Sequence, residues 1–81
     1  MKKSIVYHPI GVCSQQIEVE TENGIIRQVI FTGGCSGNTQ GISLLVQGMT
    51  VDEAIARLEG IQCRDKGTSC PDQLAQALKS L

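Results

Sequence analysis

The spacing of apolar residues changes near residue 38, and this change constrains the fold more than any other feature of the chain. Before it, runs of strand length are rich in β-formers and include a stretch in which apolar and polar residues alternate. After it, apolar residues recur every three or four positions, as on one face of a helix. Strands followed by helices are typical of an α+β domain. We therefore predict a small antiparallel three-stranded sheet followed by three helices packed on one face.

Three runs in the first part of the chain are predicted to be strands. They cover Ser4 to His8, Gln15 to Thr21 and Ile25 to Thr32. The Asn23-Gly24 dipeptide favours a type I′ turn, so the third run is expected to fold back on the second. Because the third run has apolar residues at both odd and even positions, we predict that it is covered on both faces and lies at the centre of the sheet.

The second part of the chain carries start and stop signals for three helices. The first helix is predicted to begin near Asn38, and the second to follow a capping box made by Thr50 and Glu53. The third is predicted to open at Pro71, a residue favoured in the first turn. The predicted inward positions of the first helix are Ile42, Leu45, Val46 and Met49.

Length and charge limit the classes of function. The 81 residues make a single domain, 1–81, with a thin core, so a second copy is a plausible partner. Seven basic and eight acidic side chains give a net charge of −1, which argues against binding to a phosphate backbone. The sequence has no run of about 18 apolar residues and no evident export signal, so we predict a cytoplasmic protein that does not enter a membrane.

Two of the four cysteines are predicted to lie at helix starts, Cys35 before the first helix and Cys70 before the third. The amino end of a helix carries a partial positive charge, which stabilises a thiolate and lowers the pKa of a cysteine. Reactive or metal-binding thiols are therefore expected here. The alternative is that these cysteines are simply small apolar residues of the interior.

The segment from Gly33 to Gly41, which joins the last strand to the first helix, contains four glycines, a composition that lets backbone amides converge on an anion. It lacks the lysine of a phosphate-binding P-loop, and a tight turn without a ligand remains the alternative. The predicted ligand, a small anionic molecule such as a nucleotide or a flavin-like cofactor, would lie over this loop and the third helix start. The predicted contacts are Gly34, Cys35, Ser36, Gly37, Asn38, Thr39, Ser69 and Cys70.

A metal or redox site is the second hypothesis. The sequence has no C-x-x-C pair, so zinc or iron would need cysteines that converge only in the folded chain. Cys63 and Cys70 flank a short connection and are the best candidate dithiol pair, with Cys35 as a third ligand from the facing loop. No serine or histidine constellation for hydrolysis is evident, since His8 is the only histidine.

The residues Thr68-Ser69-Cys70-Pro71-Asp72 spell TSCPD. Together with the Gly34 to Asn38 segment and the Gly48 to Glu53 segment, they resemble the TSCPD-domain family over nearly the whole chain. A related segment lies near the C-terminus of cobalamin-dependent ribonucleotide reductases, so the resemblance implies a possible reductase partner. It does not imply a complete reductase, because 81 residues cannot hold the barrel, radical cysteine and cofactor dock of that enzyme.

The sequence thus leaves three functions open. The first is a ligand- or cofactor-binding module, expected to be a homo-oligomer and accessory to a ribonucleotide reductase. The second is a redox or metal-binding module that uses Cys35, Cys63 and Cys70. The third is a structural or interaction protein without a ligand, and whether any reaction is catalysed stays open.

Overall fold

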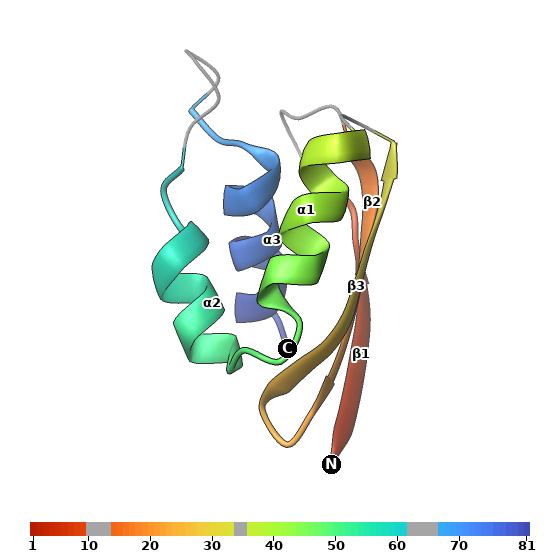
Figure 1. Ribbon diagram of the computed structural model, residues 1–81, viewed down its shortest axis with the longest axis vertical. Coiled ribbons are helices and arrows are strands. Elements are labelled where there is room, and N and C mark those ends of the chain that lie inside the picture. The colour runs from red at the N-terminus through yellow and green to blue at the C-terminus, as the bar shows by residue number, and fades with distance from the viewer. Residues whose placement is uncertain (10–13, 34–35, 62–66) are drawn as a thin grey trace.

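The computed structural model describes residues 1–9, 14–33, 36–61 and 67–81 and confirms the predicted α+β fold (Figure 1). The strands are β1 (Lys2–Tyr7), β2 (Ser14–Glu22) and β3 (Ile25–Gly33). The helices are α1 (Ser36–Val46), α2 (Val51–Leu58) and α3 (Cys70–Lys79). Each strand begins and ends within two residues of its predicted bounds, whereas α1 begins two residues before Asn38.

The sheet is antiparallel with the order β1-β2-β3, so β2 is the central strand. The predicted tight turn between β2 and β3 is confirmed, because both Asn23 and Gly24 have positive φ angles, 55° and 79°. The prediction that β3 lies at the centre is wrong. Each strand pairs with its predecessor in the chain, which places β3 at the edge of the sheet.

A β-bulge in β3 explains why its apolar residues occupy both odd and even positions. Glu20 pairs with Gln28, but Thr21 pairs with Ile26, which leaves Arg27 as an extra residue on β3. The extra residue reverses the alternation, so Ile26 and Val29 are both buried against the helices. The pattern therefore reflects a change of register, and the predicted coverage of β3 on both faces is wrong.

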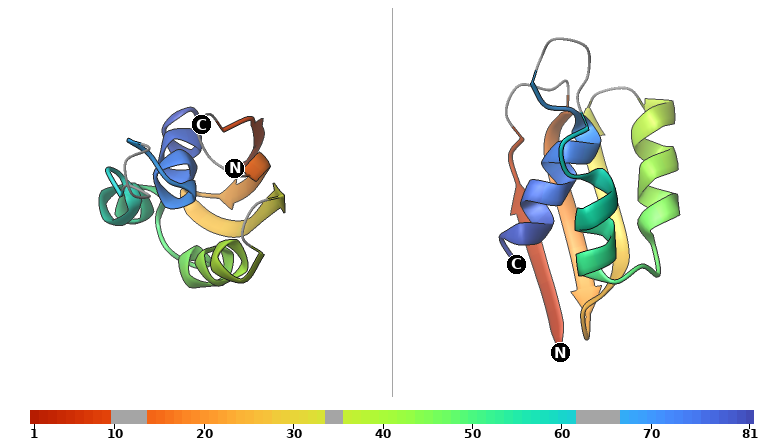
Figure 2. Two further views of the ribbon diagram at one scale, coloured as in Figure 1. Left: turned by 90° about the horizontal axis from the view of Figure 1, so that it is seen from above. Right: turned by 90° about the vertical axis from the view of Figure 1, so that its left-hand side faces the viewer.

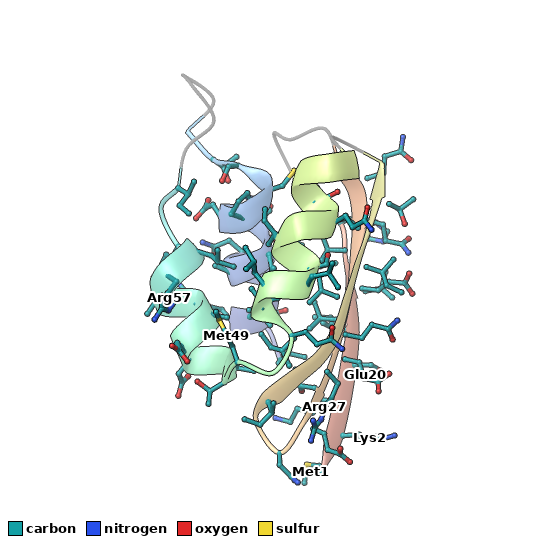
Figure 3. All side chains as sticks on the ribbon, in the orientation of Figure 1. Met1, Lys2, Glu20, Arg27, Met49 and Arg57 are labelled. Carbon is teal, nitrogen blue, oxygen red and sulfur yellow. The ribbon has the colours of Figure 1, made fainter. Side chains whose placement is uncertain are left out.

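All three helices lie on one face of the sheet, as predicted (Figure 2). The first helix, α1, packs over β3, and α3 packs over β2, while α2 packs against α3. Figure 1 shows that α1 and α3 run in the same direction and that both begin at the end where β3 finishes. The opposite face of the sheet is open, and Figure 3 shows Lys2 and Glu20 projecting from it.

The hydrophobic core lies between the sheet and α3, and its side chains are at most 6% exposed. They are Ile17, Val19, Ile26, Val29, Val46, Ala54, Leu74 and Leu78. The prediction that Leu45 faces inward is wrong, because this side chain is 73% exposed. Its neighbour Val46 turns into the core instead, and Leu44 is also exposed, at 64%.

The second helix has the predicted capping residue. The Glu53 amide donates to the Thr50 hydroxyl at 3.1 Å, and Arg57 forms an ion pair with Glu53 at 3.1 Å on the exposed face. The chain leaves α2 through Gly60, whose φ of 85° is the left-handed conformation expected after a helix. This turn directs the chain back toward the start of α3.

Candidate functional site

Five elements of the fold begin or finish at one end of the molecule, which we call the cysteine end (Figure 1). It is defined by the terminal residues Tyr7, Ser14, Gly33, Ser36 and Cys70. Cys13 immediately precedes Ser14 in the chain, and Cys35 immediately precedes Ser36. The cysteine end is therefore the part of the fold in which the predicted site must be sought.

Several predicted site residues lie outside the described residues, namely Gly34, Cys35 and Cys63. Three others, Ser36, Gly37 and Asn38, form the first turn of α1. Thr39 follows them and is buried, as is Ser69, while Cys70 is half-buried. Cys70 is the first residue of α3 rather than the residue before it.

One contact at the cysteine end joins β2 to β3. Ser14 pairs with Gly33 at the last position of the antiparallel register. Gly33 is two residues from Cys35, and Ser14 is the direct neighbour of Cys13. The sheet therefore brings together two chain segments that adjoin cysteines separated by 21 residues in the sequence.

A second contact joins the end of the α2 connection to the start of α3. The Ser69 hydroxyl donates to the Ile61 carbonyl at 2.6 Å, across eight residues of the chain. Cys63 lies two residues after Ile61, and Cys70 directly follows Ser69. The segments that adjoin these two cysteines are thus held together by a hydrogen bond between described residues.

Asp72 organises the surroundings of this contact. Its side chain is buried and accepts hydrogen bonds from the Gly60 amide at 2.8 Å and the Thr68 hydroxyl at 2.5 Å. The Gln73 side-chain amide in turn donates through Nε2 to the Thr68 hydroxyl at 2.9 Å. These donors, Thr68 above all and then Gly60, favour the charged carboxylate and hold the pKa of Asp72 below its ordinary value of 3.8.

This role of Asp72 is not evident from the sequence. An aspartate in the first turn of a helix is expected to act through the helix dipole alone. Instead, the carboxylate reaches across 12 residues to Gly60. The available signal was the positive-φ glycine at the end of α2, which indicates where the chain turns but not which side chain meets it.

The amino end of α3 has already used several of its backbone donors. The Asp72 amide donates to the Ser69 hydroxyl at 3.2 Å, and the Gln73 amide donates to the Ser69 carbonyl at 2.8 Å. Pro71 has no N–H group. Because the charged Asp72 also lies in this first turn, α3 is less suited to bind an anion than its sequence indicates.

The family model for the TSCPD domain matches residues 1–81, which is the whole chain. The chain belongs to the TSCPD-domain family. Neither the curated proteins nor the solved structures contain a match to this TSCPD domain. Within the described part of the chain, no helix has the length and apolar character needed to cross a membrane.

The described residues alone do not assemble a metal site. Among them, no group of three or more histidine, cysteine, aspartate or glutamate residues is close enough to hold an ion. Three of the four cysteines of this TSCPD domain, Cys13, Cys35 and Cys63, are outside the described ranges. The predicted metal site therefore depends on the chain segments that contain these three cysteines and adjoin the described residues.

Proposed function

We propose that this TSCPD domain is a metal-binding module in which the thiolates of Cys35, Cys63 and Cys70 hold zinc or iron at the cysteine end. The observation that carries the proposal is the hydrogen bond from Ser69 to Ile61, which joins the residue before Cys70 to the second residue before Cys63. The Ser14–Gly33 pair adds the positions next to Cys13 and Cys35 at the same end of the fold.

Chain connectivity limits how far these cysteines can lie from the described contacts. Consecutive Cα atoms are about 3.8 Å apart. Cys70 is one such spacing along the chain from Ser69, and Cys63 is two such spacings from Ile61. Zinc bound by thiolates takes four ligands at about 2.3 Å. With Cys13 as the fourth thiolate, the chain has the ligand number of a closed structural site.

The electrostatics of the cysteine end support bound thiolates. The positive ends of α1 and α3 both lie there, because the two helices run in the same direction. The start of α1, which has no acidic residue in its first turn, favours the deprotonated cysteine that metal binding needs. Ser69 also fixes the position of Cys70 in the first turn of α3, since its hydroxyl both caps the helix and binds Ile61.

Protein purified under reducing conditions without chelator is expected to contain about one zinc or iron per chain by elemental analysis. Cobalt added to metal-free protein should give the absorption of a cobalt–thiolate complex. Serine replacement of Cys35, Cys63 or Cys70 should reduce the bound metal to a small fraction. Each replacement removes one strong ligand and keeps the size of the side chain.

The matched control for these variants is Ser80→Ala, at the opposite end of α3 from Cys70. This change removes a hydroxyl that bonds only within its own turn, to the Ala77 carbonyl, so metal content should equal that of the wild type. The proposal would be wrong if the reduced wild-type protein held no metal and took up neither added zinc nor cobalt.

A small anionic ligand, such as a nucleotide or a flavin-like cofactor, is the second candidate for the same end. It is favoured by the parallel starts of α1 and α3, whose backbone amides can receive an anion. The amino end of α1 is expected to attract an anion more strongly than that of α3, because the charged Asp72 lies in the first turn of α3. The expected contacts are Gly34, Cys35, Ser36, Gly37, Asn38, Thr39, Ser69 and Cys70.

Thermal unfolding of metal-free protein with and without nucleotides, flavins and inorganic phosphate tests this second candidate. A binding ligand should raise the melting temperature in a concentration-dependent way, since it stabilises only the folded state. Asn38→Asp should abolish the shift for an anion, because it adds a negative charge to the first turn of α1. Absence of any shift across the three ligand classes would contradict this candidate.

A redox role for Cys63 and Cys70 rests on the same Ser69–Ile61 contact. In that role the two thiols form a disulfide by thiol–disulfide exchange, and the two electrons and two protons pass to a disulfide of a partner, which is reduced to two thiols. Metal-free protein with reversible oxidation of this pair would favour the redox role over the metal site. The family resemblance remains the support for a ribonucleotide reductase partner, and the four thiols favour the reducing cytoplasm.

A further inference from the structure

The surface of α1 lacks the charges expected on a helix that faces water. None of its residues, Ser36 to Val46, is ionisable, and Leu44 and Leu45 are 64% and 73% exposed. By contrast, the shorter α2 exposes Asp52, Glu53 and Arg57. Exposed apolar residues that gather without charged neighbours mark interaction surfaces.

The edge of β3 next to α1 is also uncovered. At its beginning, Ile26 exchanges backbone hydrogen bonds with Gly48 and Met49, each at 2.8 Å. Beyond Ile26, no backbone hydrogen bond between described residues reaches the free side of β3. The remaining residues, Gln28 to Gly33, carry no charge and no proline, which are the usual protection of an exposed strand edge.

These two features form one surface, which we call the α1/β3 surface and define by Leu44, Leu45 and the free edge of Gln28 to Gly33. A shallow hollow joins them, in which Leu44 and Gln40 of α1 face Val29 and Phe31 of β3. Leu44 also borders a second hollow beside Gln28, and Arg27 and Glu20 also line that hollow. Leu44 is thus contiguous with the unpaired strand edge, and the exposed Leu45 follows it on α1.

We propose that the α1/β3 surface is the interface of a two-fold symmetric dimer of this chain. In such a dimer each copy presents the same patch, so a patch of one charge repels itself. Leu44, Leu45 and Gln28 to Gly33 are uncharged, and the charged residues that border this surface, Arg27 and Glu20, are of opposite sign, so its centre meets its own copy without this repulsion. Burial of Leu44 and Leu45 there removes from water the two most exposed leucines among the described residues.

The other open surfaces of the domain are unsuited to self-association. The open sheet face carries the charges of Glu18 and Glu20 on its central strand and of Lys2 on β1, and a second copy placed there would remove these charges from water at a cost. The free edge of β1 begins with Lys2 and Lys3, which protect it in the same way. Charge therefore selects the α1/β3 surface for contact between copies.

Light scattering of the eluting protein in size-exclusion chromatography tests the dimer. The wild type is expected at twice the chain mass of 8.7 kDa. Replacing both Leu44 and Leu45 with lysine should return the mass to that of one chain, because two positive charges then face two others. Both side chains are exposed, so circular dichroism should show an unchanged fold.

The matched control is Val6→Lys, which places a lysine at another exposed apolar residue, 52% exposed on the open face. This variant should stay dimeric. Hydrogen exchange should slow with protein concentration in α1 and in Gln28 to Gly33, but not in β1. A monomeric wild type, which would leave the surface to a different protein, or a dimer that survives both lysines would overturn the proposal.

Discussion

Leu74→Ala is expected to leave the domain largely unfolded at room temperature. Leu74 is fully buried in α3, the helix that lies between the sheet and α2. Removing a buried leucine side chain costs about 2 to 5 kcal/mol. A core of this size seldom contributes more than about 3 to 5 kcal/mol of net stability, so the loss is comparable to the whole.

Urea unfolding followed by circular dichroism measures this loss, with Val6→Ala as the control. Val6 is 52% exposed on the open sheet face, so its replacement should change the free energy of unfolding by no more than about 0.5 kcal/mol. If the two variants were equally stable, α3 would not be the centre of the core. A cooperative transition near that of the wild type for Leu74→Ala would lead to the same conclusion.

The elements of the fold were predictable because their signals are local. Asn23-Gly24 specifies a tight turn by its own backbone preferences, and the structure has positive φ at both residues. Thr50 caps α2 through an amide only three residues away. Such signals need no knowledge of distant segments. The succession of strands and helices along the chain can therefore be predicted from the sequence alone.

The errors arose where a residue's environment depends on a neighbouring strand or helix. Arg27 is an extra residue because the neighbouring residues Glu20 and Thr21 of β2 pair with the residues on either side of it. No local sequence pattern predicts this bulge. Leu45 fits the apolar spacing of α1, but α1 lies at the edge of the sheet and covers only β3. Its exposure follows from the strand order, which the sequence did not determine.

In the candidate site, too, the features with local signals were predicted and those that depend on distant residues were not. The starts of α1 and α3 were predicted within two residues, because proline, glycine and capping residues mark them locally. The link between Gly60 and Asp72 spans 12 residues and was missed. The proposed ligands Cys35 and Cys63 lie outside the described residues, so their convergence with Cys70 stays a prediction.

Asp72→Ala is expected to cost about 1 to 3 kcal/mol at neutral pH. The Gly60 amide and the Thr68 hydroxyl lose their acceptor, and both hydrogen bonds are partly buried. An unpaired buried donor costs its full desolvation energy, which exceeds the net worth of an average hydrogen bond. Urea unfolding at pH 7 measures the difference from the wild type.

The matched control is Asp52→Ala, which removes an exposed aspartate from the first turn of α2. Only a favourable interaction with the helix dipole is lost there, and the expected cost is about 0.5 kcal/mol. The comparison separates the bridging role of Asp72 from the role of an acidic residue at a helix start. Equal costs for the two variants would contradict the bridging role.

The pH dependence gives a second and independent test of Asp72. Its pKa in the folded protein is below the ordinary 3.8, so its contribution is present above about pH 4 and is lost as the pH falls through the folded pKa. The wild type should therefore lose more stability below pH 4 than Asp72→Ala. If both proteins lost stability in parallel, the carboxylate would not be charged against Thr68 and Gly60. The hydrogen bonds of Gly60 and Thr68 to Asp72 would then not depend on the charge of this side chain.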